Sequence, residues 1–246
     1  KKIKSFIDHI LLLFNFEKKY FEKENVSCEF VGHPLLQNKE RSKIDINQII
    51  GKNKALISVF AGSRKSEILV LMPILLDFIK LMNEKYTDMT YVFHSTREYL
   101  DLIQSFINES SLSNCEIVSD DKIKSHILQK SVFAVAKSGT VSLEISNAKI
   151  PSIILYKMGF INFMIVKSLV KTKYANIINF AANEEIIPEL LQSNCNSKNI
   201  FKHVNSFLED PNKIKGQVNK VQNILDKLKI NGSSSELASL SLNKFL

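Results

Sequence analysis

Apolar residues along the chain form short runs that alternate with stretches of helical spacing. Seven runs have the length and the β-branched or aromatic content of buried strands; they are residues 8–14, 28–34, 55–62, 90–95, 115–119, 131–139 and 151–157. Between them, segments such as SEILVLMPILLDFIKLMNEKY repeat apolar residues every three or four positions, which predicts amphipathic helices. Strands that alternate with helices predict a parallel sheet with helices on both faces.

After the last of these runs the pattern becomes mainly helical. Helical spacing covers residues 160–182, 184–192 and 197–230, and a Gly/Ser turn then leads into a short helix at the end of the chain. No internal repeat and no long linker interrupts the chain. The sequence therefore predicts an α/β fold, a Rossmann-like parallel sheet with helices on both faces, followed by C-terminal helices.

The composition is that of a globular protein and narrows the choice of function only a little. Of the 246 residues, 45% are hydrophobic and 24% are charged. The net charge of +8 attracts anions such as nucleotide phosphates, nucleic acid or an acidic membrane. The lysines are scattered rather than gathered in one arm, which argues against a nucleic-acid partner. The longest apolar run, FIDHILLLFNF, is shorter than the ~20 residues that a membrane-spanning helix needs.

The stretch LISVFAGSRKSEI, residues 56–68, runs from a buried strand through a tight turn into a helix. Gly62 and Ser63 fall at this turn, where free backbone N–H groups and the positive end of the helix attract a phosphate. Arg64 adds a guanidinium that can grip phosphate oxygens with two hydrogen bonds. The alternative is structural: Ser63 caps the helix, and Glu67 completes or extends the cap.

The stretch AVAKSGTVSLE, residues 134–144, repeats this design, with Ser138, Gly139 and Thr140 in the turn. Glu144 is expected on the second helical turn, beyond the reach of the helix dipole, where its carboxylate is well placed to accept two ribose hydroxyl groups. A solvated surface glutamate is the alternative. Ligands of open α/β sheets bind outside the carboxyl ends of the strands, so the two turns are expected at one edge of the sheet.

Several other kinds of site are disfavoured. The sequence has neither G-x-G-x-x-G nor G-x-x-x-x-G-K-S/T, which argues against a dinucleotide oxidoreductase and a P-loop NTPase. His33 and His94 follow strands without a neighbouring acid or thiol in the sequence, which favours structural roles. No histidine or cysteine spacing indicates a metal site. The three cysteines are far apart, which predicts free thiols in a reducing cytoplasm.

One further segment, residues 156–174, combines an apolar face with four lysines. A basic amphipathic helix of this kind can lie on an anionic membrane. The alternative is a helix that packs on its own domain or on a second subunit.

These motifs, in this order, resemble those of the lipid-A-disaccharide synthases, nucleotide-sugar glycosyltransferases of the two-domain GT-B type. The matching segments include FNFEKKYFEKENVSCEFVGHPLL, FAGSRKSEI, KSGTVSLE, PSIILYKM, VKTKYANIINF and IIPELLQ. The resemblance implies a GT-B donor-binding domain. It also implies transfer of 2,3-diacylglucosamine from its UDP carrier to 2,3-diacylglucosamine 1-phosphate, which yields a β-1,6 disaccharide and UDP on the way to lipid A.

The same resemblance implies roles for individual residues. Arg64 is the catalytic residue, because its charge stabilises the departing UDP. The residues implied in donor binding are Gly62, Ser63, Glu67, Ser138, Gly139, Thr140, Glu144, Asn179, Glu189 and Gln192. In this assignment the first turn holds the diphosphate, Glu144 binds the ribose, and neither a metal ion nor a cofactor is needed.

The resemblance also implies a division of the chain into three parts. Residues 1–30 correspond to the end of a preceding domain and the crossover, 31–205 to the UDP-sugar-binding domain, and 206–246 to C-terminal helices that pack back or onto a partner. The acceptor site and the catalytic base would lie before Lys1, so this chain alone is expected to be inactive.

Four positions depart from the family pattern without removing a reacting group. Ala61, Asn15 and Ile178 replace prolines, and Gln37 replaces an aspartate. The expected partners are a UDP-diacylglucosamine donor and a lipid-linked acceptor at the cytoplasmic face of the membrane, and a homo-oligomer is left open. The alternatives are a nucleotide-binding remnant without activity and another UDP-sugar transferase or epimerase.

Overall fold

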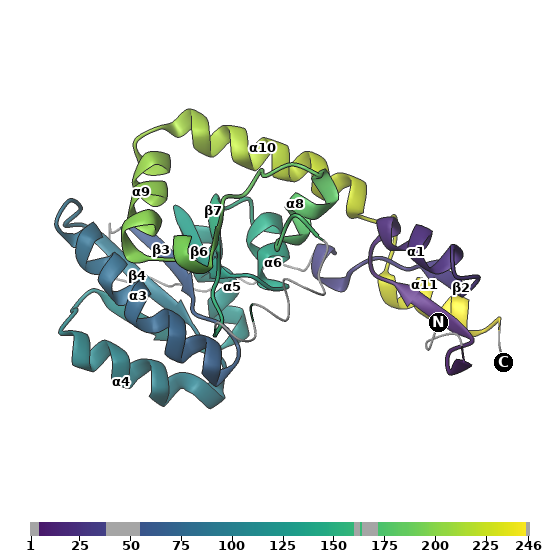
Figure 1. Ribbon diagram of the computed structural model, residues 1–246, viewed down its shortest axis with the longest axis horizontal. Coiled ribbons are helices and arrows are strands. Elements are labelled where there is room, and N and C mark those ends of the chain that lie inside the picture. The colour runs from purple at the N-terminus through teal and green to yellow at the C-terminus, as the bar shows by residue number, and fades with distance from the viewer. Residues whose placement is uncertain (1–4, 38–54, 160–162, 164–171, 245–246) are drawn as a thin grey trace. The chain divides into compact units, whose positions relative to one another are not determined.

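The structure, a computed structural model of the chain, describes residues 5–37, 55–159, 163 and 172–244. Its contacts divide the chain into two compact units, one formed by Lys1–Arg41 together with Gln222–Leu246 and the other by Ser42–Val221. Among the described residues, each unit has its own parallel sheet, and Figure 1 labels the strands and helices.

The larger unit is built on six strands that all run parallel, in the order β5-β4-β3-β6-β7-β8. They are β3 (Ala55–Phe60), β4 (Met89–His94), β5 (Cys115–Val118), β6 (Phe133–Lys137), β7 (Ser152–Tyr156) and β8 (Glu189–Leu191). The strand order reverses between β3 and β6. In open sheets of this kind, ligands bind at the carboxyl ends of the strands where the order reverses.

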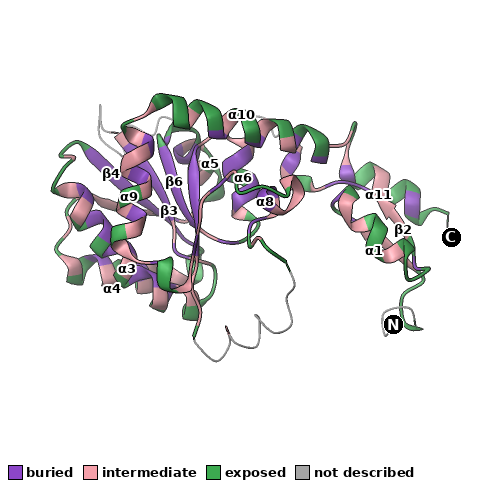
Figure 2. Ribbon diagram, turned by 45° about the horizontal axis from the view of Figure 1, so that its top comes forward, coloured by how far each residue is buried: buried purple, intermediate pink, exposed green. Residues whose placement is uncertain are grey.

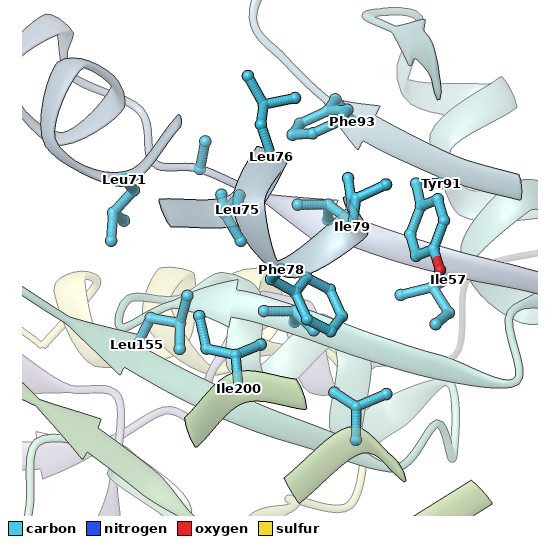
Figure 3. Close-up of a cluster of buried hydrophobic side chains, with 14 of the residues drawn as sticks. Ile57, Leu71, Leu75, Leu76, Phe78, Ile79, Tyr91, Phe93, Leu155 and Ile200 are labelled. Atoms are coloured by element: carbon cyan, nitrogen blue, oxygen red, sulfur yellow. The ribbon is translucent and has the colours of Figure 1, made fainter. Parts of the chain in front are cut away.

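One face of this sheet is covered by α3 (Lys65–Asn83), α4 (Leu100–Ser110) and α9 (Ser197–Leu208). Leu71, Leu75 and Phe78 of α3 lie one helical turn apart, so they project from one side of the helix. They pack with Ile57 of β3 and Ile200 of α9 in a core from which water is excluded (Figure 3). Removal of this apolar surface from water stabilises the fold.

The other face is covered by α5 (Asp121–Lys130), α6 (Val141–Asn147) and α8 (Ile177–Ala182). Leu56 and Val92 alternate along their strands with the residues of the first core and therefore point the opposite way. They pack against Ile127 of α5. Figure 2 shows the buried strands between helices whose outer sides are exposed. The predicted parallel sheet with helices on both faces is confirmed.

The smaller unit is a β-α-β unit joined to the last helix. Its elements are β1 (His9–Leu12), α1 (Lys18–Glu22), β2 (Ser27–Phe30) and α11 (Ser234–Leu242). The hydroxyl of Ser241 donates to Glu29 Oε2 at 2.6 Å and accepts from His9 Nε2 at 3.1 Å. Because Ser241 has only one proton to donate, His9 carries its proton on Nε2 in this arrangement. These bonds connect α11 to both strands.

Short 3-10 turns and one long helix complete the described chain: η2 (Asn15–Glu17), η3 (Pro34–Leu36), η4 (Arg97–Tyr99), η5 (Gln192–Asn194) and α10 (Pro211–Leu228). Gln217 of α10 pairs with both backbone groups of Ser152, since its Oε1 accepts from the N–H at 2.8 Å and its Nε2 donates to the carbonyl at 3.0 Å. The side chain thus continues the hydrogen bonding of β7 at its first residue.

All seven predicted strands are present, but one predicted helix is wrong. Within residues 184–192, β8 is a short strand that pairs with β7 through Ile154, Leu155 and Tyr156. The apolar spacing of this segment suits a helix, but its edge position on the sheet imposes an extended backbone. Most of the helix predicted over residues 160–182 lies outside the described residues, and its described part is helical at Phe163 and in α8.

Candidate functional site

The two turns singled out in the sequence lie side by side at one edge of the central sheet. β3 and β6 are neighbours, with Phe60 in register with Ala136, and each strand is followed at once by its turn. Because the strands run parallel, both turns are at the carboxyl edge, where the strand order reverses. The prediction that the two turns are neighbours is confirmed.

Gly62, in the first turn, has a backbone conformation that favours glycine. Its φ is +119°, and a Cβ at this position would lie 2.6 Å from Oε2 and 2.7 Å from Cβ of Glu67. The helix α3 begins at Lys65, and Arg64 is the N-cap residue without a side-chain cap bond. The alternative in which Ser63 caps this helix is therefore wrong, because Ser63 lies one residue before the cap.

The carboxylate of Glu67 pairs with groups of the first turn and with the last residue of β6. Its Oε2 accepts from the backbone N–H of Ser63 at 3.1 Å, and its Oε1 accepts from Nη1 of Arg64 at 3.0 Å. Oε1 also lies 2.8 Å from Nζ of Lys137, the last residue of β6. Burial raises the pKa of Glu67, but Lys137, the Ser63 N–H and Arg64 outweigh burial and hold that pKa below its ordinary value. Glu67 is therefore an anion.

The two cations on Glu67 differ in their exposure. The Arg64 side chain is 74% exposed, whereas that of Lys137 is 17% exposed. The guanidinium is thus open to a ligand from solvent. Nζ of Lys137 also lies 5.7 Å from the centre of the Tyr156 ring, within the range of a cation–π interaction. The sequence reasoning missed Lys137, although a cation at the end of an otherwise buried strand is a signal that it has a partner.

The second turn is held by a contact from further along the chain. The hydroxyl of Ser138 donates to the carbonyl of Ala175 at 2.8 Å. A Cβ on Gly139 would have no heavy atom within 4 Å, so this residue borders open space. Thr140 is the N-cap of α6 without a side-chain cap bond.

Glu144 is exposed in the first turn of α6. Its predicted place on the second turn is wrong, and a carboxylate in the first turn interacts favourably with the helix dipole.

Asn179 is fully buried, and its amide is used inside the protein. Nδ2 donates to the carbonyl of Ile187 at 2.6 Å and to Glu189 Oε1 at 2.8 Å. Oδ1 accepts from the N–H groups of Ile186 and Ile187, both at 2.9 Å. These four bonds satisfy the hydrogen-bonding capacity of the amide, so the geometry does not leave this side chain available for direct contact with a ligand.

The carboxylate of Glu189 is likewise used in hydrogen bonds inside the protein. Its two carboxylate oxygens accept from the backbone N–H groups of Ala175 at 2.7 Å and Asn176 at 2.9 Å, besides the Asn179 amide. Gln192 differs, since its Oε1 accepts from the Met158 N–H at 3.3 Å while its buried Nε2 has no hydrogen-bond partner among the described residues. Of these three predicted residues, Gln192 alone keeps a donor without a partner in the described chain.

The histidine that follows β4 has a structural role. His94 Nε2 lies 2.8 Å from the Ser58 hydroxyl, which lies 2.7 Å from the Ser131 hydroxyl. Ser131 donates to the carbonyl of Ile127 at 2.9 Å. Ser58 must therefore donate to Ser131, and His94 must donate from Nε2 to Ser58. Burial lowers the pKa of His94 to about 3, so the ring is neutral near pH 7.

Two of the three thiols do not supply a ready nucleophile. Burial raises the pKa of Cys115 to about 12 and that of Cys195 to about 11. The thiolate is the reactive form of cysteine, so both groups are unreactive at neutral pH.

Residues 156–174, predicted as a basic helix, lie mostly outside the described residues. In the described part, Tyr156 ends β7 and Lys157 donates to the carbonyl of Cys195 at 3.1 Å. The prediction of a helix is therefore wrong for these first residues. Across the described ranges no helix combines the length and the apolar character needed to cross a bilayer, and in that same part of the chain no group of three His, Cys, Asp or Glu side chains could hold a metal ion.

Comparison with solved structures shows the class to which this fold belongs. The S. aureus MnaA-UDP co-structure superposes with a TM-score of 0.69 at 14% identity, over 99% of this chain and 61% of that chain. The C-terminal domain of a glycosyl transferase group 1 family protein from Francisella tularensis gives a TM-score of 0.51 at 16% identity, over 75% of this chain and 90% of that chain. The chain has the Rossmann-like fold of GT-B glycosyltransferases.

Within this class, the chain belongs to the lipid-A-disaccharide synthetase family (LpxB), whose family model matches residues 1–242. The lipid-A-disaccharide synthase of Rickettsia prowazekii is 34% identical over 225 residues, which are 90% of this chain and 58% of that protein. The chain spans 58–66% of the length of this and comparable curated relatives. The family resemblance inferred from the motifs is confirmed.

Proposed function

We propose that this chain is the donor-binding part of a glycosyltransferase that transfers 2,3-diacylglucosamine from its UDP carrier to 2,3-diacylglucosamine 1-phosphate in lipid A biosynthesis. The observation that carries the proposal is the adjacency of two strand-to-helix turns at the reversal point of the sheet, one of them with an exposed guanidinium. Membership of the family supports the reaction, and the UDP in the MnaA co-structure supports the choice of ligand.

In this proposal the first turn binds the diphosphate. Gly62 and Ser63 let the backbone approach the phosphates closely, since no side chain projects from Gly62. Arg64 is the catalytic residue. Negative charge grows on the UDP as its bond to the sugar breaks, and a guanidinium beside the phosphate stabilises that charge. Before the donor binds, Glu67 holds Arg64 and the turn in place.

The second turn completes the donor site. Ser138, Gly139 and Thr140 form this part of the donor site, and the open space beside Gly139 is consistent with an approaching ligand. Glu144 accepts hydrogen bonds from the ribose hydroxyls, a task for which an exposed carboxylate is suited. Gln192 offers its Nε2 to the donor.

The remaining two residues of the predicted site have an indirect role. Asn179 and Glu189 hold the segment around Ala175, which in turn accepts the hydrogen bond from Ser138. We assign them as positioning residues of the donor site.

In this proposal the three parts of the chain have different roles. Residues 1–30 end a preceding domain, 31–205 bind the donor, and 206–246 pack back or onto a partner. The lipid-linked acceptor and the catalytic base lie outside the residues of the donor site. The reaction takes place at the cytoplasmic face of the membrane.

Isothermal titration calorimetry with UDP tests the proposal. The 246-residue chain is expected to bind UDP saturably and without added metal, whereas a failure to bind UDP under folded conditions contradicts the proposal. Another UDP-sugar transferase or an epimerase would share the two turns but prefer a donor without acyl chains. Competition between UDP-diacylglucosamine and UDP-N-acetylglucosamine therefore decides between these functions, since only the synthase favours the acylated donor.

A further test separates an active enzyme part from a remnant that only binds nucleotide. The chain is mixed with the N-terminal portion of a lipid-A-disaccharide synthase from a relative, and disaccharide formation is followed by mass spectrometry. Product that depends on both portions supports the enzyme; UDP binding without product in this mixture supports the remnant.

A further inference from the structure

Glu67 is an internal anion placed where the proposed donor would bring a phosphate. The carboxylate accepts from a backbone N–H, a guanidinium and an ammonium group, contributed by Ser63, Arg64 and Lys137. Proteins use these same three kinds of donor to bind phosphate oxygens. The side chain is only 13% exposed, so the carboxylate lies within the site rather than at its rim.

The charges around Glu67 are not balanced by that one carboxylate. Arg64 Nη1 at 3.0 Å and Lys137 Nζ at 2.8 Å share the single oxygen Oε1. The first residues of α3, a helix of 19 residues, add the positive end of a helix dipole. Two cations and one anion leave a net positive charge in a partly buried place. A diphosphate carries more negative charge than one carboxylate, so it balances this set more completely.

We propose that Lys137 is a ligand of the donor diphosphate, and that Glu67 takes the place of the phosphate in the unliganded chain. Donor binding then transfers Lys137 and Arg64 from the carboxylate to phosphate oxygens. The inference rests on the proposed function, because it assumes a diphosphate at these turns. Lys137 ends β6 while Arg64 follows β3, so the diphosphate is held from the carboxyl ends of two neighbouring strands.

The surroundings of Lys137 suit this exchange. An ammonium group has three donors, and Glu67 is the hydrogen-bond acceptor that Lys137 has among the described residues. The side chain of Lys137 is 17% exposed, so it is not sealed in the core of the protein. Without a ligand, Glu67 pairs with both cations, and this avoids the cost of a partly buried charge without a partner.

Calorimetry with UDP on single variants of the 246-residue chain tests the assignment. Lys137→Met is expected to weaken UDP binding by roughly 10- to 100-fold, as for the loss of a charge-assisted hydrogen bond. Lys137→Arg, which keeps the charge, is expected to retain most of the affinity. Lys80→Met is the matched control, because it removes a lysine from an ion pair with Asp77 near the other end of α3. This control is expected to bind UDP as the wild type does.

The same Lys137 substitution in a protein that carries Glu67→Gln distinguishes two roles of Lys137: binding of phosphate and neutralisation of Glu67. Glu67→Gln removes the competing charge and supplies the reference affinity for UDP in this background. If Lys137 binds phosphate, Lys137→Met still weakens binding by roughly tenfold or more in this background. If Lys137 only neutralises Glu67, the second substitution has no further effect.

Two results overturn the inference while the proposed function stands: unchanged UDP affinity in Lys137→Met, or loss of its effect in the Glu67→Gln background. Failure of the wild-type chain to bind UDP instead overturns the proposed function. Circular dichroism and thermal unfolding of each variant establish that it is folded, and the double variant, which lacks both charges, keeps the comparison valid if Lys137→Met alone is unstable.

Discussion

The hydroxyl of Ser138 donates a hydrogen bond of 2.8 Å to the carbonyl of Ala175. The N–H of Ala175 in turn donates to Glu189 at 2.7 Å, and Asn179 donates to the same carboxylate at 2.8 Å. The position of the second turn therefore depends on a segment that follows it by many residues. Through this chain of hydrogen bonds, Asn179 and Glu189 influence the turn without facing a ligand.

Replacement of Glu189 by Gln tests this dependence. The Gln side chain has one acceptor oxygen in place of two. At least one of the N–H groups of Ala175 and Asn176 then points at the NH2 group of Gln and loses its hydrogen bond. We expect a loss of about 1–3 kcal/mol in the free energy of unfolding, measured with urea. Glu109→Gln, on an exposed position of α4, is the control and should change that free energy by less than ~0.5 kcal/mol. Equal stabilities of the two variants would contradict the assigned role of Glu189.

Replacement of Arg64 by Ala tests the proposed diphosphate contact. The variant is expected to bind UDP more weakly by about 1.5–3 kcal/mol, because a charge-assisted hydrogen bond is lost. Stability should change little, since the side chain is 74% exposed. Calorimetry with UDP measures the first effect and thermal unfolding the second. An unchanged dissociation constant for UDP would contradict the proposed binding of the phosphates at this turn.

Two glycines of the site are expected to respond differently to alanine. Gly62→Ala should destabilise the fold by about 1–3 kcal/mol, since φ is +119° and the new Cβ would meet Glu67. Gly139→Ala should leave stability almost unchanged, because its Cβ would enter open space, yet it should weaken UDP binding if the donor occupies that space. Urea unfolding and calorimetry on both variants check this contrast. A stable Gly62→Ala protein would show that the turn readjusts freely.

Stability is expected to depend on pH through His94. Burial lowers the pKa of His94 in the folded chain to about 3 from its ordinary value of 6.5. Between these values the unfolded chain binds a proton that the folded chain does not, so stability falls as the pH falls from about 6.5 towards 3. The contribution of one such group reaches about 1.4 kcal/mol per pH unit.

Carboxyl groups also titrate in this range, so the comparison is made with His94→Gln. The difference in unfolding free energy between the wild type and this variant should narrow steadily from pH 7 to pH 4, as measured by urea unfolding at each pH. A difference that stays constant over this range would mean that the ring is protonated equally in both states.

The order of strands and helices could be predicted from the sequence because it depends on local patterns. Buried parallel strands read as compact apolar runs, and amphipathic helices repeat apolar residues at three- and four-residue steps. The sequence does not predict the strand β8, because its three residues, Glu189–Leu191, lie in a segment of helical spacing. Pairing with β7 determines the conformation of β8. Local patterns locate the start of a helix only to within a residue or two. The structure therefore places Ser63 before the cap of α3 and Glu144 in the first turn of α6.

What the sequence determined by itself was the alternation of elements, the composition of the two turns and the family to which they belong, because these are properties of neighbouring residues. Only the tertiary structure decided that β3 lies beside β6, that Lys137 reaches Glu67, and that Asn179 and Glu189 are used inside the protein. Strand order and side-chain pairing depend on contacts between residues far apart in the chain. The spacing of hydrophobic residues is a local pattern over a few positions, so it does not predict which distant residues will be in contact.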